Sequence, residues 1–166
     1  MPGVLVSPAD GTVAEVTELE HDEYIGGPAV RIGIFLSIFN VHINRTPCAT
    51  RVIRLRYERG EFLNALKPES ALRNENMWIG LEEQEFPHRP LIVRQISGAI
   101  ARRIVCDLKP GQRLARGEKF GMIKLGSRTE LIVPKEDHLK VEVQVGQKVL
   151  GGETILISYA SNGSGP

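Results

Sequence analysis

A short segment that occurs twice in the second half of the chain constrains the fold more than any other feature. Residues 111–123 read Gly-Gln-Arg-Leu-Ala-Arg-Gly-Glu-Lys-Phe-Gly-Met-Ile, and residues 146–158 align with them as Gly-Gln-Lys-Val-Leu-Gly-Gly-Glu-Thr-Ile-Leu-Ile-Ser. Each Gly-Gln starts a turn that needs a permissive backbone, and each Gly-Glu turns the chain again after a short apolar strand. The repeat therefore predicts two similar units of turns and short strands.

The rest of the chain shows the periodicity of β-strands. Short apolar or alternating segments bounded by Gly, Pro and Asp predict strands at residues 11–17, 29–39, 49–57, 91–97, 100–106 and 139–145. Helical periodicity is nearly absent, and its best candidate is a turn or short helix at residues 61–66, ended by Lys67-Pro68. Because the repeat also resembles the hammerhead turn of lipoyl- and biotinyl-carrier proteins, we expect a mostly β, barrel-sandwich architecture with few short helices.

Length and composition fit one soluble domain. With 42% apolar and 25% charged residues, a chain of 166 residues can bury a core without disulfides or metal. A formal charge of +1 and an aromatic content of 5% argue against a nucleic-acid partner. Cys48 and Cys106 lack the spacing of a zinc or redox motif, so no metal site is expected. We expect a single domain at residues 1–160 and a flexible tail at residues 161–166.

Membrane insertion is not predicted from the sequence. No apolar run reaches the roughly 18 residues that span a bilayer. The N-terminus also lacks the charged-then-apolar order of a signal peptide. The chain begins a few residues before its first motif, so an anchor upstream of it in the natural protein is compatible with the sequence.

Four segments contain residue types that can carry chemistry. Taken singly, each has a structural explanation: the first is a good turn sequence, and His42 follows an apolar strand as a core histidine does. Their order and combination are more informative than any one of them. The segments are Ser7-Pro-Ala-Asp-Gly11, Phe39-Asn-Val-His-Ile-Asn-Arg-Thr-Pro47, Asn74-Glu-Asn76 and Phe120-Gly-Met-Ile-Lys-Leu-Gly-Ser-Arg128.

In this order, the segments resemble those of the phosphatidylserine decarboxylase family, particularly its short form, over residues 7–158. The family shows the elements S-P-x-D-G, V-H-x-N-R-x-P, N-E-R, F-G-x-I-x-x-G-S-R and V-x-V-G-Q-x-V-x-x-G-E, and this chain has all five. Asn76 replaces the usual Arg of the third element. Arg45 stands where longer bacterial relatives carry a second histidine, and Asn40 replaces an acidic residue, so the resemblance assigns both proton-transfer roles to His42.

The resemblance implies that the chain cuts itself between Gly126 and Ser127. The Ser127 hydroxyl attacks the unhindered Gly126 carbonyl to form an ester, while His42 acts as the base and Asp10 orients its ring. Loss of the Ser127 α-proton then breaks the ester. Residues 1–126 leave with a new carboxylate, and residues 127–166 begin with a pyruvoyl group.

The resemblance also implies the reaction, the cofactor and the partners. The pyruvoyl cofactor forms a Schiff base with the amine of phosphatidylserine or a related serine phospholipid and accepts the electrons released with carbon dioxide. Arg45, Arg128 and Asn44 are the candidate substrate-binding residues, although a structural ion pair explains either arginine equally well. The expected location is the cytoplasmic face of the cell membrane, either peripheral or through an N-terminal anchor, and a homo-oligomer is compatible with the sequence.

Two other functions remain open from the sequence. One is a non-catalytic barrel-sandwich module, and the other is a pyruvoyl-dependent decarboxylase of a soluble amino acid. A carrier function is less consistent with the chain, because Lys124 is expected on a strand that leads into Gly126-Ser127 and not at a hairpin tip. Phe35, Phe39 and Trp78 can form an apolar lip for membrane contact, but core packing explains them as well.

Overall fold

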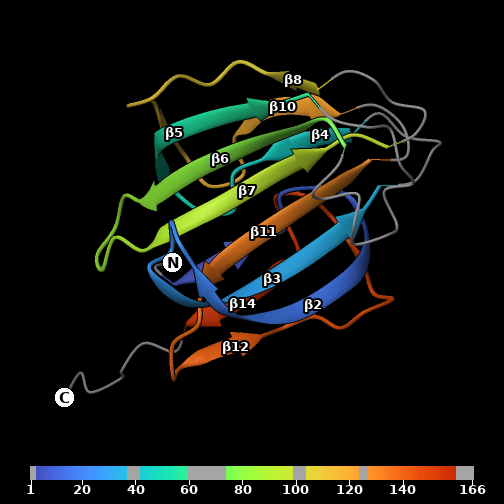
Figure 1. Ribbon diagram of the computed structural model, residues 1–166. Coiled ribbons are helices and arrows are strands. Elements are labelled where there is room, and N and C mark those ends of the chain that lie inside the picture. The colour runs from blue at the N-terminus through green and yellow to red at the C-terminus, as the bar shows by residue number, and fades with distance from the viewer. Residues whose placement is uncertain (1–2, 37–41, 60–73, 99–103, 124–126, 160–166) are drawn as a thin grey trace.

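The chain is described by a computed structural model that covers residues 3–36, 42–59, 74–98, 104–123 and 127–159 (Figure 1). Within these ranges it forms fourteen strands and no helix, which confirms the mostly β prediction. No helix in this part of the chain is long and apolar enough to cross a bilayer. The short helix expected at residues 61–66 and the tail at residues 161–166 lie outside the described residues.

One large sheet organises the fold. It contains eight strands in the order β13-β2-β3-β11-β7-β6-β5-β9, and every neighbouring pair is antiparallel. Figure 1 shows this sheet curling, with β11 in its middle between β3 and β7. The bounds are β2 Gly11–Asp22, β3 Gly27–Phe35, β5 Thr50–Glu58, β6 Asn76–Glu83, β7 Pro90–Ile96, β9 Arg113–Leu114, β11 Arg128–Pro134 and β13 Lys148–Val149.

Two small antiparallel sheets complete the described fold. The first has the order β1-β14-β12 and the second the order β4-β10-β8. In Figure 1 they lie on opposite sides of the large sheet's strands, with β12 and β14 at the bottom and β8 and β10 at the top. The bounds are β1 Val4–Val6, β4 His42–Arg45, β8 Ile104–Cys106, β10 Lys119–Ile123, β12 Leu139–Val141 and β14 Ile155–Tyr159.

The two copies of the repeat fold alike. Each starts at a glycine with positive φ, which is 88° at Gly111 and 94° at Gly146, and each then forms a two-residue strand. Each turns again at a second such glycine, Gly117 or Gly152, with φ of 75° and 77°. These two turns touch, because a Cβ added to Gly117 would lie 3.8 Å from the Gly152 Cα. The internal repeat therefore corresponds to two turn-strand units that meet at their Gly-Glu turns.

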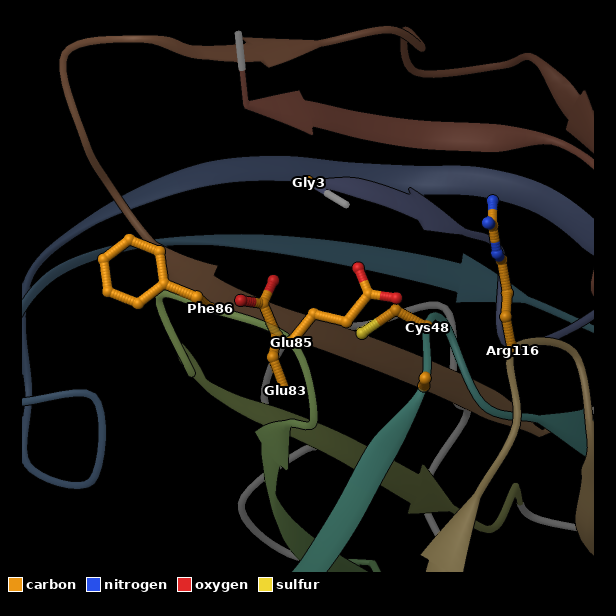
Figure 2. A pocket seen from close by; sticks show the side chains of 7 residues that line it. Gly3, Cys48, Glu83, Glu85, Phe86 and Arg116 are labelled. Carbon is orange, nitrogen blue, oxygen red and sulfur yellow. The ribbon is translucent and has the colours of Figure 1, made fainter. Parts of the chain in front are cut away.

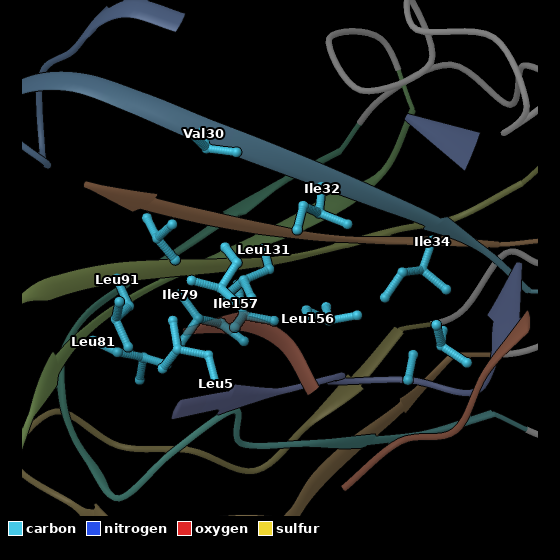
Figure 3. Packing of buried hydrophobic residues seen from close by; sticks show 14 of the residues in the cluster. Leu5, Val30, Ile32, Ile34, Ile79, Leu81, Leu91, Leu131, Leu156 and Ile157 are labelled. Atoms are coloured by element: carbon cyan, nitrogen blue, oxygen red, sulfur yellow. The ribbon is translucent and has the colours of Figure 1, made fainter. Parts of the chain in front are cut away.

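The main apolar core lies against one face of the large sheet. Figure 3 shows Ile32 of β3, Leu131 of β11 and Ile157 of β14 packed together, and all three are fully buried. Successive side chains of a strand point to opposite faces, so the other face of the sheet needs cover of its own. There Trp78 packs edge-to-face on Tyr24 within a second cluster. Trp78 is therefore a packing residue in this structure.

Candidate active site

Ser127 lies directly before β11, at the head of the central strand. Its side chain is fully buried, and its Oγ has no hydrogen-bond partner among the described residues. Its carbonyl oxygen accepts a hydrogen bond from the Leu36 N–H at 2.9 Å. A buried hydroxyl without a partner is unfavourable, and a role as a reacting group is one physical reason for such a hydroxyl. Gly126 lies outside the described residues, so the predicted bond is described from its Ser127 side alone.

The backbone of His42 lies beside the segment that leads to Ser127. In the pairing of β4 with β10, His42 is opposite Ile123, and Asn44 is opposite Gly121. Strand β10 ends at Ile123, four residues before Ser127. The side chain of His42 lies outside the described part of the structure, so its role as the base stays a prediction.

Asn44 links β4 to the strand that follows Ser127. Its side chain is fully buried. The Nδ2 donates to Thr129 Oγ1 at 3.0 Å, and the Oδ1 accepts from Gln95 Nε2 at 2.9 Å. Both ends of the Asn44 amide are thus engaged with β11 and β7. Its predicted contact with substrate stays a prediction.

The turn that contains Asp10 joins the second motif to the repeat. The Arg45 N–H donates to the Pro8 carbonyl at 2.9 Å, which fixes the end of β4 on this turn. The exposed Asp10 carboxylate accepts a hydrogen bond from the Gly151 N–H at 2.6 Å through Oδ1. The turn therefore brings the first motif, the second motif and the C-terminal repeat together. The predicted contact of Asp10 with the His42 ring stays a prediction.

Asp10 and Arg45 share a cavity of about 230 Å³, which Glu153 also lines. The Arg45 Nη1 donates to the Gly117 carbonyl at 2.8 Å, and a guanidinium has five N–H donors. The cavity thus combines one guanidinium with two carboxylates. Such a set of groups can bind a ligand that carries both anionic and ammonium groups.

Arg128 occupies the other face of the large sheet. Its side chain is 1% exposed, although it is an arginine. Its Nη2 lies 2.5 Å from Glu15 Oε2, and its Nε donates to Glu130 Oε2 at 3.1 Å. The guanidinium is therefore engaged with two carboxylates, and its predicted contact with substrate stays a prediction.

Two more arginines complete this cluster. Glu130 is fully buried, with Arg94 Nη1 at 3.2 Å and Arg31 Nε at 3.8 Å. Burial raises the pKa of Glu15, but the hydrogen bond from Arg31 and the charges of Arg128 and Arg31 hold that pKa below its usual value. Burial lowers the pKa of Arg94 despite the charge of Glu130. We call Glu15, Arg31, Arg94, Arg128 and Glu130 the Arg128 network.

The third motif borders this network. Asn76, which replaces the family's usual arginine, accepts a hydrogen bond from Arg94 Nη2 at 3.2 Å through its Oδ1. Motif reasoning did not find Arg31, Arg94 or Glu130. A usable signal exists nonetheless, because each is a charged residue within an apolar strand: Ala-Val-Arg-Ile, Ile-Val-Arg-Gln-Ile and Thr-Glu-Leu-Ile.

A second cavity lies at the other end of β6 and contains none of the predicted site residues. It has a volume of about 60 Å³ and is lined by residues that include Cys48, Glu83 and Arg116 (Figure 2). Burial raises the pKa of the Cys48 thiol, which makes it a poor nucleophile. Among the described residues, no group of three or more His, Cys, Asp or Glu side chains is arranged to hold a metal ion.

A second ion-pair cluster, which is buried at Glu83 and exposed at Glu136, borders this cavity. Arg89 Nη1 lies 3.4 Å from Glu83 Oε2, and its Nε lies 2.5 Å from Glu136 Oε2. Its guanidinium carbon lies 3.8 Å from the ring centre of Tyr159. We call Glu83, Arg89 and Glu136 the Arg89 cluster.

The fold and the site together define a β-sheet domain with a buried serine at the head of its central strand, whose hydroxyl has no hydrogen-bond partner in the part of the chain that the structure describes. The sequence pattern of the phosphatidylserine decarboxylase family matches residues 1–157. The chain therefore belongs to the phosphatidylserine decarboxylase family, a family of carboxy-lyases.

Relatives with curated names agree with this membership. The phosphatidylserine decarboxylase proenzyme of Rhodopirellula baltica is 53% identical over 157 residues, which is 95% of this chain and 65% of the relative. The proenzyme of Carboxydothermus hydrogenoformans is 47% identical over 152 residues, 92% of this chain and 70% of the relative. The proenzyme of Chlorobaculum parvum is 44% identical over 155 residues, which is 93% of this chain and 70% of the relative. The chain thus spans about two thirds of these relatives' length. No solved structure matches the chain significantly.

Proposed function

We propose that the chain is a phosphatidylserine decarboxylase that matures by cutting itself between Gly126 and Ser127. Membership of the family and the word proenzyme in the relatives' names support this proposal. The observation that carries it is the Ser127 hydroxyl, which is fully buried and has no partner among the described residues. A hydroxyl kept free of competing hydrogen bonds is available to attack a neighbouring carbonyl.

The proposed cleavage converts one peptide bond into an ester and then eliminates it. The Ser127 Oγ bonds to the Gly126 carbonyl carbon, the C–N bond breaks, and His42 relays the hydroxyl proton to the freed Ser127 nitrogen, which becomes an amine. Removal of the Ser127 α-proton then expels the carboxylate of residues 1–126. Water replaces the nitrogen of the remaining dehydroalanine, which leaves as ammonia, and residue 127 becomes a pyruvoyl group.

The Ser127 Oγ leaves with the carboxylate of residues 1–126 and the Cβ becomes a methyl group, so a buried position with no hydrogen-bond partner for the Oγ among the described residues suits the pyruvoyl group that remains. When formed, the group supplies an electrophilic carbonyl for the substrate amine and an electron sink for decarboxylation. His42 is proposed to hold the proton that replaces the lost carboxylate. The strand β11, which begins at Arg128, holds residue 127 between its partner strands β3 and β7.

We assign the lipid headgroup to the cavity that Asp10, Arg45 and Glu153 line. A serine phospholipid headgroup carries a phosphate, a carboxylate and an ammonium group. The Arg45 guanidinium suits either anion, and the two carboxylates suit the ammonium group. Arg45 and His42 are on the same four-residue strand, which favours a headgroup that reaches from the cavity toward residue 127.

The substrate's acyl chains lie in a bilayer, so the proposal includes peripheral contact with the cytoplasmic face of the cell membrane. Ile43, which is 38% exposed, lies between His42 and Arg45 on β4 and also lines the headgroup cavity. An apolar side chain beside a headgroup site is suited to contact with lipid. A homo-oligomer stays a prediction.

The mass of the denatured protein tests the cleavage. We expect two pieces, residues 1–126 and residues 127–166, the second with a keto group in place of its amine. Ser127→Ala should remain one chain. Ser97→Ala is the matched control, because Ser97 is also fully buried but donates to the Glu75 carbonyl at 3.2 Å, and it should still be cut.

An unbroken parent chain would refute self-processing. The substrate needs a separate assay, in which the cut protein is mixed with phosphatidylserine vesicles or with free serine. Carbon dioxide from the vesicles alone supports the proposed substrate. Carbon dioxide from free serine alone would favour the amino-acid decarboxylase, and none from either would favour a non-catalytic module.

A further inference from the structure

We propose that the Arg128 network positions Ser127 for its own cleavage, so that Glu130 and Arg128 are positioning residues in maturation. This inference rests on the proposed self-processing. The network lies on the face of the large sheet opposite the main apolar core. No motif residue on that face has been assigned a role in maturation above.

The network acts on the residue next to the reacting one. Arg128 is the first residue of β11 and is paired with Phe35 of β3 and Ile96 of β7. Ser127 is covalently attached to it, and the Ser127 carbonyl is held by the Leu36 N–H at 2.9 Å. The backbone on the C-terminal side of the predicted bond is therefore fixed from both neighbouring strands.

The side chain of Arg128 is fixed as firmly as its backbone. It lies across β3 at Gly33, where a Cβ would overlap its Nη2 and come within 2.5 Å of its Cζ. It then reaches Glu15 of β2 at 2.5 Å. Only a glycine at position 33 leaves room for the Arg128 side chain in this conformation. A methyl group at position 33 would therefore displace the guanidinium.

Glu130 holds the arginines together. It is fully buried, and it lies within 3.8 Å of Arg31, Arg94 and Arg128. Among these five residues, three guanidiniums and two carboxylates leave one excess positive charge, and the charge of Glu58 also acts on Arg94. Loss of the Glu130 charge would leave the three guanidiniums with Glu15 as their one carboxylate within the network, and their repulsion would move Arg128.

Such a movement matters because Ser127 must attack the bond that precedes it. Intramolecular attack depends steeply on geometry, and a displacement of about 1 Å can cost about a hundredfold in rate. The Ser127 Oγ has no partner of its own to correct its position among the described residues. Its placement is therefore left to its backbone, which Arg128 anchors.

The test is the rate of cutting after synthesis. The parent chain and its variants are made by cell-free translation, and the uncut fraction is followed over time on denaturing gels. We expect Glu130→Gln and Gly33→Ala to cut at least about tenfold more slowly than the parent. Gly33→Ala changes no charge, so it separates displacement of Arg128 from loss of a carboxylate.

Glu83→Gln is the matched control. Glu83 is also a buried carboxylate paired with an arginine, but it is at the opposite end of β6 from the Asn76–Ile96 pair that neighbours Arg128. The Glu83→Gln variant should be cut at the same rate as the parent chain. Circular dichroism confirms that each variant is folded, and Glu15→Gln, in which the carboxylate is partly exposed, gives a milder second variant if Glu130→Gln does not fold.

Hydroxylamine identifies the step that slows. At neutral pH and mild temperature it cleaves an ester and leaves peptide bonds intact. The uncut fraction of Glu130→Gln should therefore resist hydroxylamine if the serine is misplaced before the ester forms. Cleavage of that uncut fraction by hydroxylamine would show that the ester forms normally and would overturn the positioning role. Parental cutting rates in Glu130→Gln and Gly33→Ala would overturn it as well. An uncut parent would instead refute self-processing, and this inference with it.

Discussion

The two ion-pair clusters contain the same residue types but connect different parts of the molecule and differ in exposure, since the Glu136 side chain is 41% exposed. The Arg128 network joins β2, β3, β11 and β7 on one face of one sheet. The Arg89 cluster joins the end of β6 to Glu136, which follows β11, and to Tyr159 of β14 in the small sheet. The first cluster therefore fixes strands within a sheet beside Ser127, and the second attaches one sheet to another.

The clusters also differ in their balance of charge. The Arg128 network has three guanidiniums for two carboxylates, whereas the Arg89 cluster has one guanidinium for two carboxylates. The pKa of Glu15 accordingly lies below its usual value because of Arg31 and Arg128. The pKa of Glu83 lies above its usual value, because burial outweighs the hydrogen bonds and charge of Arg89. Loss of a carboxylate should therefore destabilise the Arg128 network more than the Arg89 cluster.

The largest expected effect is the loss of Glu130. In a Ser127→Ala background, where every sample is one chain, Glu130→Ala should lower the free energy of unfolding by about 3–5 kcal/mol, because buried arginines lose their common partner. Glu83→Ala should cost less than about 2 kcal/mol. Urea unfolding followed by circular dichroism measures both. Equal losses would mean that charge balance does not distinguish the clusters.

A smaller effect is expected from crowding the path of Arg128. Gly33→Ala should lower the free energy of unfolding by about 1–3 kcal/mol, since the added methyl group overlaps a fully buried side chain. Gly27→Ala is its control on the same strand, because nothing lies within 4 Å of a Cβ there. The control should change stability by less than about 1 kcal/mol. A neutral Gly33→Ala would show that the arginine has another path.

The sequence predicted four of the large sheet's long strands, β2, β3, β5 and β7, and did not predict β6 and β11, which are buried along most of their length. Each of the six expected segments contains a strand, although β2 continues to Asp22 through polar residues that pair with β3. Strands β6 and β11 were not among them. Six of the seven residues of β11 are buried, and a strand buried on both faces has no alternation to detect.

The sequence motifs indicated candidate site residues, but the sequence did not indicate residues that come together only through the pairing of strands. The order of the motifs selected Ser127 and Asp10 as candidates, and their roles in the reaction stay predictions. The network residues Arg31, Arg94 and Glu130 come from three strands, and no local pattern states which strands are neighbours. Their isolation among apolar residues indicates burial with a partner, but the partner is known only from the register.

The smallest effect, and the most direct test of charge balance, is the pH dependence of stability. The folded pKa of Glu15 is below its ordinary value of 4.5, so the unfolded chain binds more protons between the two values. The stability that Glu15 contributes is therefore present above pH 4.5 and is lost as the pH falls through the folded pKa. Glu83 has a raised pKa, so it lowers stability as the pH rises from 4.5 through its folded value.

The two carboxylates should consequently respond to pH in opposite directions. In the Ser127→Ala background, Glu15→Gln should become more destabilising between about pH 4 and about pH 7, and Glu83→Gln should become less so, each by about 1 kcal/mol or less. Urea unfolding at both pH values measures the changes. The same sign in both variants would mean that the arginines beside Glu15 and the burial of Glu83 do not set the two pKa values, and the contrast between the clusters would then reduce to their position relative to Ser127.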